Sequence, residues 1–312
     1  MNRFLQILKM SIAAFLFFSA ISAQLLSPLS LADPSADIRP LHYLASFQDP
    51  QTGGLKEEYL DESQPLETDW AIMAFAASGY NPDSVGTTKS LVDFAKTNAC
   101  TLSSLTDIER RVIALESAGI NTRELECNLP KKITDRTQNS GQIGDSLIST
   151  VFGVLALTAA EENVSPQTIT YIENNQKENG GWDSGWGTES NFTAQTIMAL
   201  VASKQTINSE VFAKAKKYLK SLQTNSGGIK YDENEWSIES DTFSNSFVLQ
   251  AIYSLGEDPK DPYWLKEGLS ILDDLKQARK LGDKLVIVVA SDQKNPKHQR
   301  LLSPSITKPK NK

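Results

Sequence analysis

Aromatic and acidic side chains gather after the glycine-rich segments of the chain, where together they could form a ligand-binding site. Aromatic rings stack on planar or apolar groups and attract cations, and carboxylates beside them strengthen the preference for a cation. We therefore predict an aromatic pocket with an acidic mouth that binds a hydrophobic or cationic ligand. Its candidate ligand-binding residues are Trp70, Trp182, Trp186, Tyr231, Trp236 and Asp241.

A structural role is the alternative for several aromatic and acidic residues. Trp182 could pack on a neighbouring part of the fold. Asp69, Asp145 and Asp241 come just before or at the start of apolar helical patterns. An aspartate at an N-cap accepts backbone N–H bonds and stabilises its helix by about 1 kcal/mol. We favour the structural role for Trp182 and for the three aspartates.

Trp186 and Trp236 lie beyond the glycine-rich turns, and for them the two roles are equally supported. If they bind a ligand, their indoles should face a central opening and be partly exposed. Indoles packed between helices would instead leave the predicted site without its main residues.

No metal site or cofactor is predicted. Both histidines, His42 and His298, lie near the ends of the chain, and neither is paired with a cysteine at metal-ligand spacing. The acidic loops at Asp61 and Asp232 do not follow the spacing of a calcium-binding EF-hand loop.

A glutamine- and glycine-containing segment recurs along the chain. Its fullest copy is QKENGGW at Gln176 to Trp182, and weaker copies open at Gln48, Gln138 and Gln223. In chain order, the four copies are separated by 90, 38 and 47 residues. The longest interval fits two periods, with a faded copy at Phe94 to Ala99. Such a period predicts repeated units that bury their apolar faces against each other.

Each repeat combines two kinds of helix. A helix with one apolar stripe, such as Val211 to Gln223, precedes the turn, and a helix that is apolar on most sides follows it. The second kind begins near Asp69 and Trp70, Asp145, Asn191 and Asp241. Strict alternation of the two predicts an all-α fold with two concentric layers, the apolar helices inside.

These segments resemble the prenyltransferase and squalene-oxidase repeat family, whose hallmark is a Gln-x-x-x-Gly-Gly-Trp turn. The resemblance covers about Asp37 to Lys266, and the full motif stands only at Gln176 to Trp182. It implies an α/α toroid of helical hairpins, the fold of terpene cyclases, protein prenyltransferase β subunits and cobalamin carriers. The repeat is specific for this fold and says little about function.

The catalytic motifs of that family are missing from this sequence. There is no Asp-x-Asp-Asp, no zinc-ligand set and no thioester motif, and Asp273 to Gln277 lacks the last carboxylate of Asp-Asp-x-x-Asp. We therefore expect non-catalytic binding of a small molecule or a surface polymer. The alternative is a terpene cyclase or prenyltransferase-like enzyme with non-standard catalytic residues.

The N-terminus is typical of an export signal. Arg3 and Lys9 give it a basic start, Met10 to Ala23 is apolar, and we favour cleavage after Ala32 over cleavage after Ala23. We expect a secreted or extracytoplasmic protein with no stable membrane span after cleavage. Its net charge would then be −9, which argues against binding nucleic acid. The predicted divisions are a signal peptide at 1–32, a toroid at 33–282 and an atypical tail at 283–312.

Cys100 and Cys127 are the only cysteines, and export favours a disulfide between them. The predicted helix from Leu105 to Ala118 argues against it, since fourteen helical residues span roughly 21 Å. A disulfide needs Cα atoms within about 7 Å, so the loop at Asn121 to Glu126 would have to return along the helix. We therefore favour unpaired thiols and keep the disulfide as the alternative.

The C-terminal part departs from the repeat. About five and a half hairpins are predicted, the last helix being an outer one from Tyr263 to Leu281, and no last inner helix follows. The ring would then have an open seam. The apolar residues expected to be exposed there are Phe247, Leu249, Ile252, Ile72, Met73 and Phe75.

After this helix the chain resembles a different family. Leu272 to Asp292 is similar to a short piece of cytidylyltransferase-like proteins, in which a helix leads into a buried parallel strand. A strand at Lys284 to Ala290 would have no partner, and its Leu285 to Val289 part is the only apolar patch that could cover the seam. We interpret the tail as a fusion or frame artefact.

Overall fold

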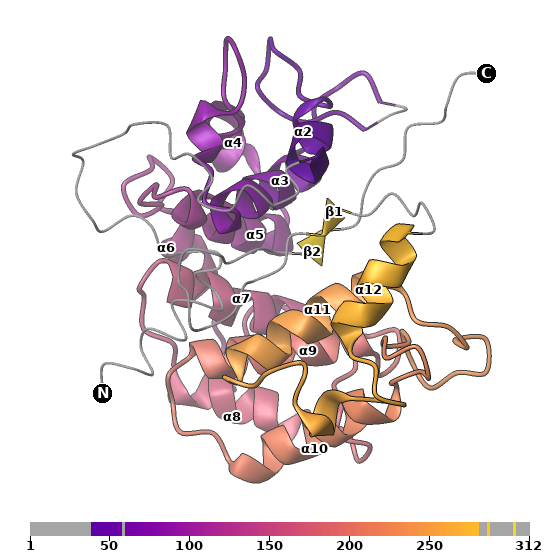
Figure 1. Ribbon diagram of the computed structural model, residues 1–312. Coiled ribbons are helices and arrows are strands. Elements are labelled where there is room, and N and C mark those ends of the chain that lie inside the picture. Colours follow the sequence, from indigo (N-terminus) through magenta and orange to yellow (C-terminus); the bar gives the residue numbers. More distant parts are fainter. Residues whose placement is uncertain (1–38, 58–59, 281–285, 288–301, 304–312) are drawn as a thin grey trace.

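The computed structural model describes residues 39–57, 60–280, 286–287 and 302–303, which form two layers of helices (Figure 1). The inner helices are α3 (Pro65–Ala77), α5 (Leu105–Ser117), α7 (Leu147–Ala159), α9 (Ser190–Ala202) and α11 (Thr242–Ser254). The outer helices are α2 (Arg39–Ala45), α4 (Leu91–Asn98), α6 (Leu129–Thr134), α8 (Pro166–Asn174), α10 (Ser209–Ser221) and α12 (Ile271–Lys280). Three short 3-10 helices are η1 (Pro82–Ser84), η2 (Ala99–Thr101) and η3 (Pro262–Trp264).

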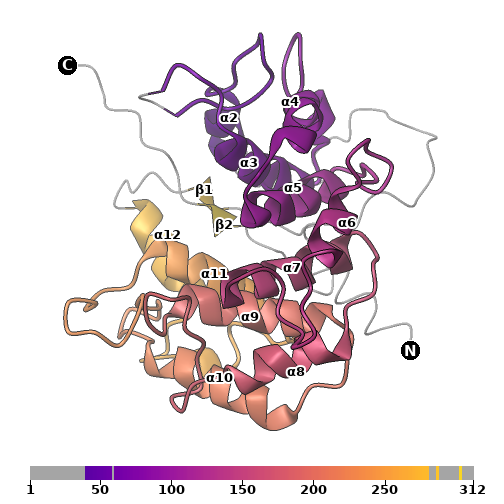
Figure 2. The same cartoon turned by 180° about the vertical axis from the view of Figure 1, so that it is seen from behind.

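Burial separates the two layers as the sequence predicts. Inner helix α9 buries twelve of its thirteen residues, whereas outer helix α10, of equal length, buries four. Each inner helix packs on the next, from α3 through α5, α7 and α9 to α11, and the view from behind shows α7 between α5 and α9 (Figure 2). The all-α toroid is confirmed: within described residues 39–255, β-pairing is limited to isolated bridges in the turns.

The starts of two inner helices differ from the prediction. Helix α3 begins at Pro65, because proline suits the first turn of a helix, so Asp69 lies inside the helix and not at its N-cap. Ser146, not Asp145, caps α7, and its hydroxyl accepts a hydrogen bond from Ser149 N. Asp241 does cap α11, where its carboxylate accepts from Ser244 N at 2.8 Å.

The repeated glutamine ties its own turn to the next outer segment. Gln176 Nε2 donates to Gly180 O at 2.8 Å and to Val211 O at 2.9 Å. Gln223 and Gln48 make the same pair of bonds in their own repeats. Gly180 has a φ of +94°, and a Cβ there would collide with the Lys214 carbonyl, so glycine is required. The motif therefore specifies how repeats join.

The two cysteines form a disulfide, with Cα atoms 5.5 Å apart, so the expectation of unpaired thiols is wrong. The outer helix after α5 is the reason. Helix α6 has only six residues, against thirteen in α10, and begins at Leu129. The chain therefore runs back along α5 partly as a loop, in the segment between α5 and α6. Ten residues of loop can span up to about 33 Å. It brings Cys127 back to Cys100.

The last outer helix is shorter than predicted. Residues from Tyr263 form η3 and a turn at Lys266–Leu269, where Gly268 has a φ of +77°, and α12 begins only at Ile271. No further α-helix follows α12 within the described part of the chain. The described residues contain five inner helices, and most of the chain after α12, where the sequence predicts no sixth, lies outside the described residues.

The seam between α3 and α11 is covered, so the expected exposure of its apolar residues is wrong. Those residues (Phe247, Leu249, Ile252, Ile72, Met73, Phe75) are at most 8% exposed. The Trp70 and Phe247 rings meet across the seam with centroids 6.3 Å apart. Strand β2 (Leu302–Ser303) lies against both α3 and α11, as Figure 1 shows.

The predicted lone strand has a partner. Strand β1 (Val286–Ile287) pairs antiparallel with β2, with Val286 opposite Ser303, so the parallel strand implied by the cytidylyltransferase resemblance is not formed there. The rest of the Leu285 to Val289 patch lies outside the described residues, as does the predicted signal peptide 1–32. None of the described helices has the length and apolar character needed to cross a membrane.

Candidate functional site

The five inner helices surround a small central cavity with a volume of about 40 Å³. Each helix contributes two side chains three positions apart, because residues three apart lie on one helix face. The pairs are Trp70 and Met73, Arg110 and Ile113, Phe152 and Leu155, Gln195 and Met198, and Phe247 and Gln250. This regularity indicates that the cavity is the centre of the toroid.

The cavity wall is apolar except at three positions. Seven of the ten lining side chains are aromatic, branched aliphatic or methionine, and the exceptions are Arg110, Gln195 and Gln250. None of the ten carries a carboxyl group. Such a wall suits an apolar ligand.

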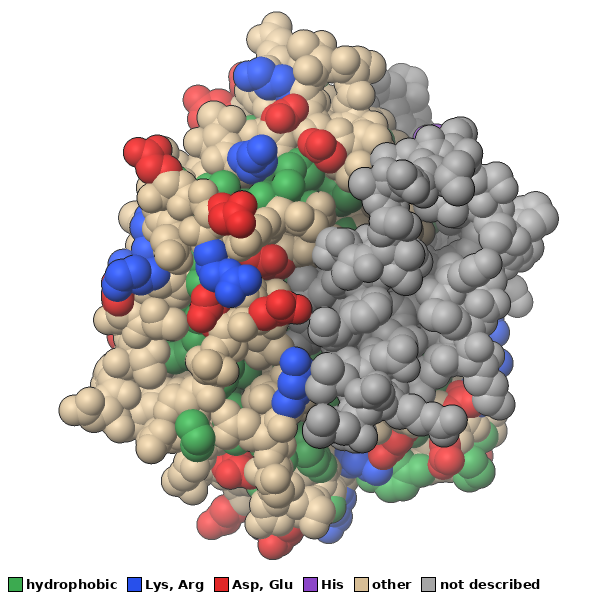
Figure 3. Space-filling model, turned by 90° about the vertical axis from the view of Figure 1, so that its left-hand side faces the viewer, with side chains coloured by type: hydrophobic (Ala, Val, Ile, Leu, Met, Phe, Trp, Pro, Cys, Tyr) green, Lys and Arg blue, Asp and Glu red, His purple; other side chains and the backbone are tan. Residues whose placement is uncertain are grey.

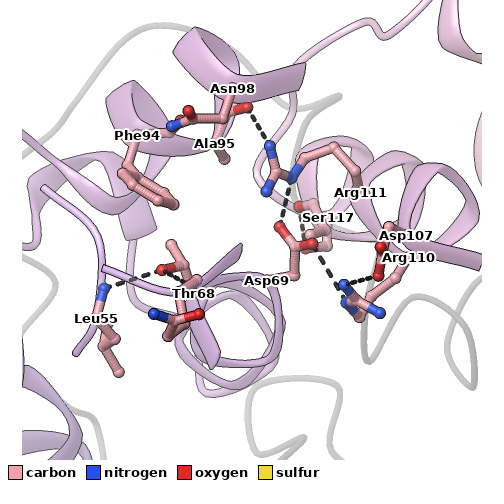
Figure 4. A network of polar contacts seen from close by, with 12 residues as sticks. Leu55, Thr68, Asp69, Phe94, Ala95, Asn98, Asp107, Arg110, Arg111 and Ser117 are labelled. Atoms are coloured by element: carbon pink, nitrogen blue, oxygen red, sulfur yellow. Dashed lines mark hydrogen bonds and ion pairs between the residues drawn. The ribbon is translucent and has the colours of Figure 1, made fainter. Parts of the chain in front are cut away.

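A buried ion-pair network between α3 and α5 holds Arg110 (Figure 4). Arg110 Nη2 donates to Asp107 Oδ1 at 2.6 Å, and Arg110 Nε lies 3.3 Å from Asp69 Oδ2 without hydrogen-bond geometry. Arg111 Nε donates to Asp69 Oδ1 at 2.5 Å and Nη1 donates to Ala95 O. Burial raises the pKa of Asp69, and both guanidinium groups oppose that shift.

A second buried carboxyl, Glu109, has no such partner. Both of its oxygens are buried without a hydrogen bond within the described residues, and burial raises its pKa well above the usual value. Glu109 faces α7, where its Oε1 lies 3.3 Å from the position a Cβ on Gly153 would take. Burial thus favours the neutral form of Glu109, while the charge of Arg136 opposes this rise in its pKa.

Of the six sequence-predicted site residues, only Trp70 lines the cavity. Trp182 is fully buried, and its Nε1 donates to Ile172 O at 2.8 Å, so the structural role favoured by the sequence is the one it has here. The other four lie around the starts of α9 and α11. They are not brought together with Trp70 in one pocket.

Trp186 and Trp236 lie on the turns before α9 and α11, with 91% and 79% of their surfaces exposed. They do not line the cavity, and they are not packed between outer helices. Tyr231 is 40% exposed, and its carbonyl accepts a hydrogen bond from Ser190 N, the first residue of α9. Whether these residues bind a ligand stays a prediction.

One acidic residue near the turns, Glu189, is buried. Glu189 caps α9 by accepting from Asn191 N and Phe192 N, and burial raises its pKa to about 7, with Asp232 and Asp241 adding to the shift. Within the described residues, no group of three or more His, Cys, Asp or Glu side chains could hold a metal ion.

Most of the cavity lining escaped the sequence analysis. Arg110, Phe152, Gln195 and Phe247 lie inside helices and not beside the glycine-rich turns, where the candidate residues were expected. A usable signal was present: these residues stand at matching positions of successive apolar helices. A polar residue at such a position of an otherwise apolar helix indicates that this face borders the cavity and does not pack against another helix.

Comparison with known proteins supports this architecture. Residues 139–257 match the family model of the squalene-hopene cyclase C-terminal domain. No curated protein sequence matches the chain.

Among solved structures, a variant of the type II terpene cyclase MstE from Scytonema, in complex with its substrate geranylgeranyl dihydroxybenzoate, superposes with a TM-score of 0.55. It is 12% identical over 91% of this chain and 81% of that chain. A second variant of the same enzyme, without ligand, gives a TM-score of 0.44 at 13% identity over 91% and 79%. At these identities the likeness concerns the fold alone, which is a terpenoid cyclase-like α/α toroid.

Proposed function

We propose that the protein binds an apolar small molecule in its central cavity, outside the cytoplasm and without catalysing a reaction. The observation that carries this proposal is the wall of ten side chains, seven of them apolar and none of them acidic. Protonating an alkene would need an acid facing the ligand, and no lining residue can supply one.

Location outside the cytoplasm rests on two independent features of the chain. The basic and apolar start of residues 1–32 is typical of an export signal. The Cys100–Cys127 disulfide fits an oxidising compartment, since cytosolic thiols are kept reduced.

An enzyme of the terpene cyclase or prenyltransferase kind is the second candidate. It is favoured by the resemblance to a type II terpene cyclase over most of both chains. The acid would then be Glu67, one turn before Trp70 on α3, whose pKa is raised by burial and by the neighbouring carboxyl Glu57. Product analysis after incubation with linear isoprenoids tests this candidate, and cyclic products that disappear in Glu67→Gln would replace the binding proposal.

A surface polymer is the third candidate ligand, favoured by the exposed indoles Trp186 and Trp236. Exposed tryptophans can stack on flat polymer units.

The distribution of charged side chains does not favour binding of nucleic acid, because Lys and Arg are interspersed with Asp and Glu on the face drawn in Figure 3.

A thermal-shift screen separates these candidates, since a ligand that binds the folded state raises its melting temperature. The screen contains linear isoprenoids, cobalamins, glycans and divalent ions. We expect an isoprenoid to raise the Tm of the wild type and of Trp236→Ala, but not of Phe152→Trp, which fills the cavity. A shift lost in Trp236→Ala and kept in Phe152→Trp would instead place binding on the surface.

A further inference from the structure

A second hollow lies on the outer surface, between the end of α8 with the turn that follows it (Glu173 to Glu178) and the start of α10 (Asn208 to Lys214). Its volume is about 380 Å³, which is in the range of small-molecule sites, whereas the central cavity has about 40 Å³. Eight of its nine lining residues are polar or charged, and the exception is Val211. We call this hollow the outer groove.

Hydrogen bonds hold the two sides of the outer groove together. Gln176 Nε2 donates to Gly180 O at 2.8 Å and to Val211 O at 2.9 Å, across the groove. Asn208 N donates to Glu173 Oε1 at 3.1 Å. Both cross-groove bonds join residues that are 35 positions apart in the chain. The groove therefore has its shape before any ligand arrives.

Other side chains of the outer groove are free to contact a ligand. Asn174 and Glu178 are exposed, and neither side chain makes a hydrogen bond or an ion pair within the described residues. Three glutamates and two lysines line the groove, so its charge is nearly balanced. Amide, carboxylate and ammonium groups together donate and accept hydrogen bonds. This mixture suits the hydroxyl groups of a neutral ligand, which also donate and accept.

The turn that carries Trp186 adjoins the outer groove at Lys177. Lys177 Nζ lies 3.9 Å from Asp183 Oδ2, and Asp183 Oδ1 accepts hydrogen bonds from Gly185 N at 2.8 Å and Gly187 N at 2.9 Å. Asp183 thus fixes this turn beside the groove, and the indole of Trp186 on it is 91% exposed. An indole offers a flat apolar face, on which the apolar face of a sugar ring can stack.

A second exposed indole lies on the next loop. Asn179 Nδ2, in the turn after the groove, donates to Glu233 Oε2 at 3.4 Å. Glu233 belongs to the loop before α11 that carries Trp236, whose side chain is 79% exposed. Direct contacts therefore link the outer groove to the loops of both tryptophans.

We propose that the outer groove, Trp186 and Trp236 bind a neutral β-1,4-linked polysaccharide. One sugar places its hydroxyl groups in the groove, and the rings of further sugars stack on the two indoles. A neutral chain is preferred because a polycation would meet the two lysines of the groove, and a polyanion would meet its three glutamates and the carboxylates beside Trp236. A β-1,4-linked chain is extended, so that one molecule reaches all three places. This site is separate from the central cavity and does not require that the cavity bind a ligand.

Cellohexaose, a neutral hexamer of β-1,4-linked glucose, tests this site against its dimer cellobiose. Binding to the full-length protein is measured by isothermal titration calorimetry. We expect cellohexaose to bind at least about tenfold more tightly than cellobiose, because only the longer chain reaches the indoles as well as the groove. Equal affinity for the two, or no binding of cellohexaose, would overturn the proposal. Tighter binding of hexalysine than of cellohexaose would also overturn it, in favour of a basic protein segment.

Two variants with exposed side chains locate the site. Trp186→Ala and Asn174→Ala should each weaken cellohexaose binding by up to about tenfold and leave the Tm unchanged. Asn225→Ala, an exposed asparagine in the corresponding turn of the next repeat, is the matched control, and it should leave the affinity unchanged. Phe152→Trp, in the central cavity, should also leave it unchanged. Binding that is lost in Phe152→Trp and kept in Trp186→Ala would place the sugar in the central cavity and overturn the proposal.

Discussion

Asp69 on α3 and Arg111 on α5 form an ion pair in which both side chains are fully buried, with Arg111 Nε 2.5 Å from Asp69 Oδ1. The repeat places Glu109 at the position on α5 that Asp69 has on α3, each just before a cavity-lining residue. Gly153 on α7 then matches Arg111, and the carboxyl of Glu109 meets a glycine instead of an arginine. The α3–α5 junction therefore has an arginine beside its buried carboxylate, and the α5–α7 junction has a glycine at the matching position.

Removing one partner of the Asp69–Arg111 pair should destabilise the protein strongly. Asp69→Ala leaves the guanidinium of Arg111 buried without its counter-charge, and we expect a loss of about 3–5 kcal/mol in the free energy of unfolding, measured by urea denaturation. Lys131→Ala, which removes an exposed pair with Asp135, is the control and should cost less than about 1 kcal/mol. Similar losses in both variants would contradict a special role for the buried pair.

Glu109 should make stability depend on pH. Its pKa in the folded protein is raised above the ordinary 4.5, so the folded state holds a proton that the unfolded state releases. The contribution of protonated Glu109 to the free energy of unfolding is complete below about pH 4.5. It is lost as the pH rises toward the pKa of Glu109 in the folded protein. Glu109→Gln should remove this part of the decline and raise the Tm at pH 8 relative to wild type. A wild-type and variant Tm difference that stays constant from pH 4 to pH 8 would speak against it.

The disulfide should contribute measurably to stability. Cys100 and Cys127 are 27 residues apart, and closing a loop of that size lowers the entropy of the unfolded chain by an amount worth about 3–4 kcal/mol. We expect Cys100→Ser combined with Cys127→Ser to lower the Tm, and a reducing agent to lower the Tm of wild type but not of the double variant. If reduction lowers the Tm of both equally, its effect does not act through this bond.

The two tryptophans of the segment from Trp182 to Trp186 should respond in opposite ways to substitution. Trp182 is fully buried and its indole N–H is bonded to Ile172 O, so Trp182→Ala should cost about 3–5 kcal/mol. Trp186 is 91% exposed, and Trp186→Ala should change stability by less than about 0.5 kcal/mol. Guanidinium unfolding curves of the two variants give the comparison, and a large loss in Trp186→Ala would show that its turn packs on something else in solution.

Deleting Asp283 to Lys312 should expose the seam between α3 and α11. Strand β2 lies against both helices, and each apolar side chain uncovered there forfeits about 1.5–3 kcal/mol of burial. We expect a lower Tm or aggregation, seen by calorimetry and light scattering. An equally stable, monomeric truncation would show that the Trp70–Phe247 contact closes the seam by itself.

The sequence alone determined the architecture of this protein. Helices with one apolar stripe alternate with helices that are apolar on most sides, and glutamine- and glycine-containing turns join them. This pattern leaves few ways to bury the apolar faces, and the two-layer toroid follows from it. The sequence also predicts interactions between residues that are close in the chain, such as the N-cap that Asp241 provides for the helix that follows it. Such features depend on contacts within a few residues.

Only the tertiary structure decided which residues meet across the ring. The path of the loop before α6 pairs Cys100 with Cys127, and the angular position of each inner helix turns Arg110 and Gln195 into the cavity. Trp186 and Trp236 share the residue type of Trp70, yet their side chains are exposed on the turns before α9 and α11. Successive residues of a helix point about 100° apart around its axis. When a helix is apolar on most sides, the periodicity of its apolar residues does not show which of them faces the cavity.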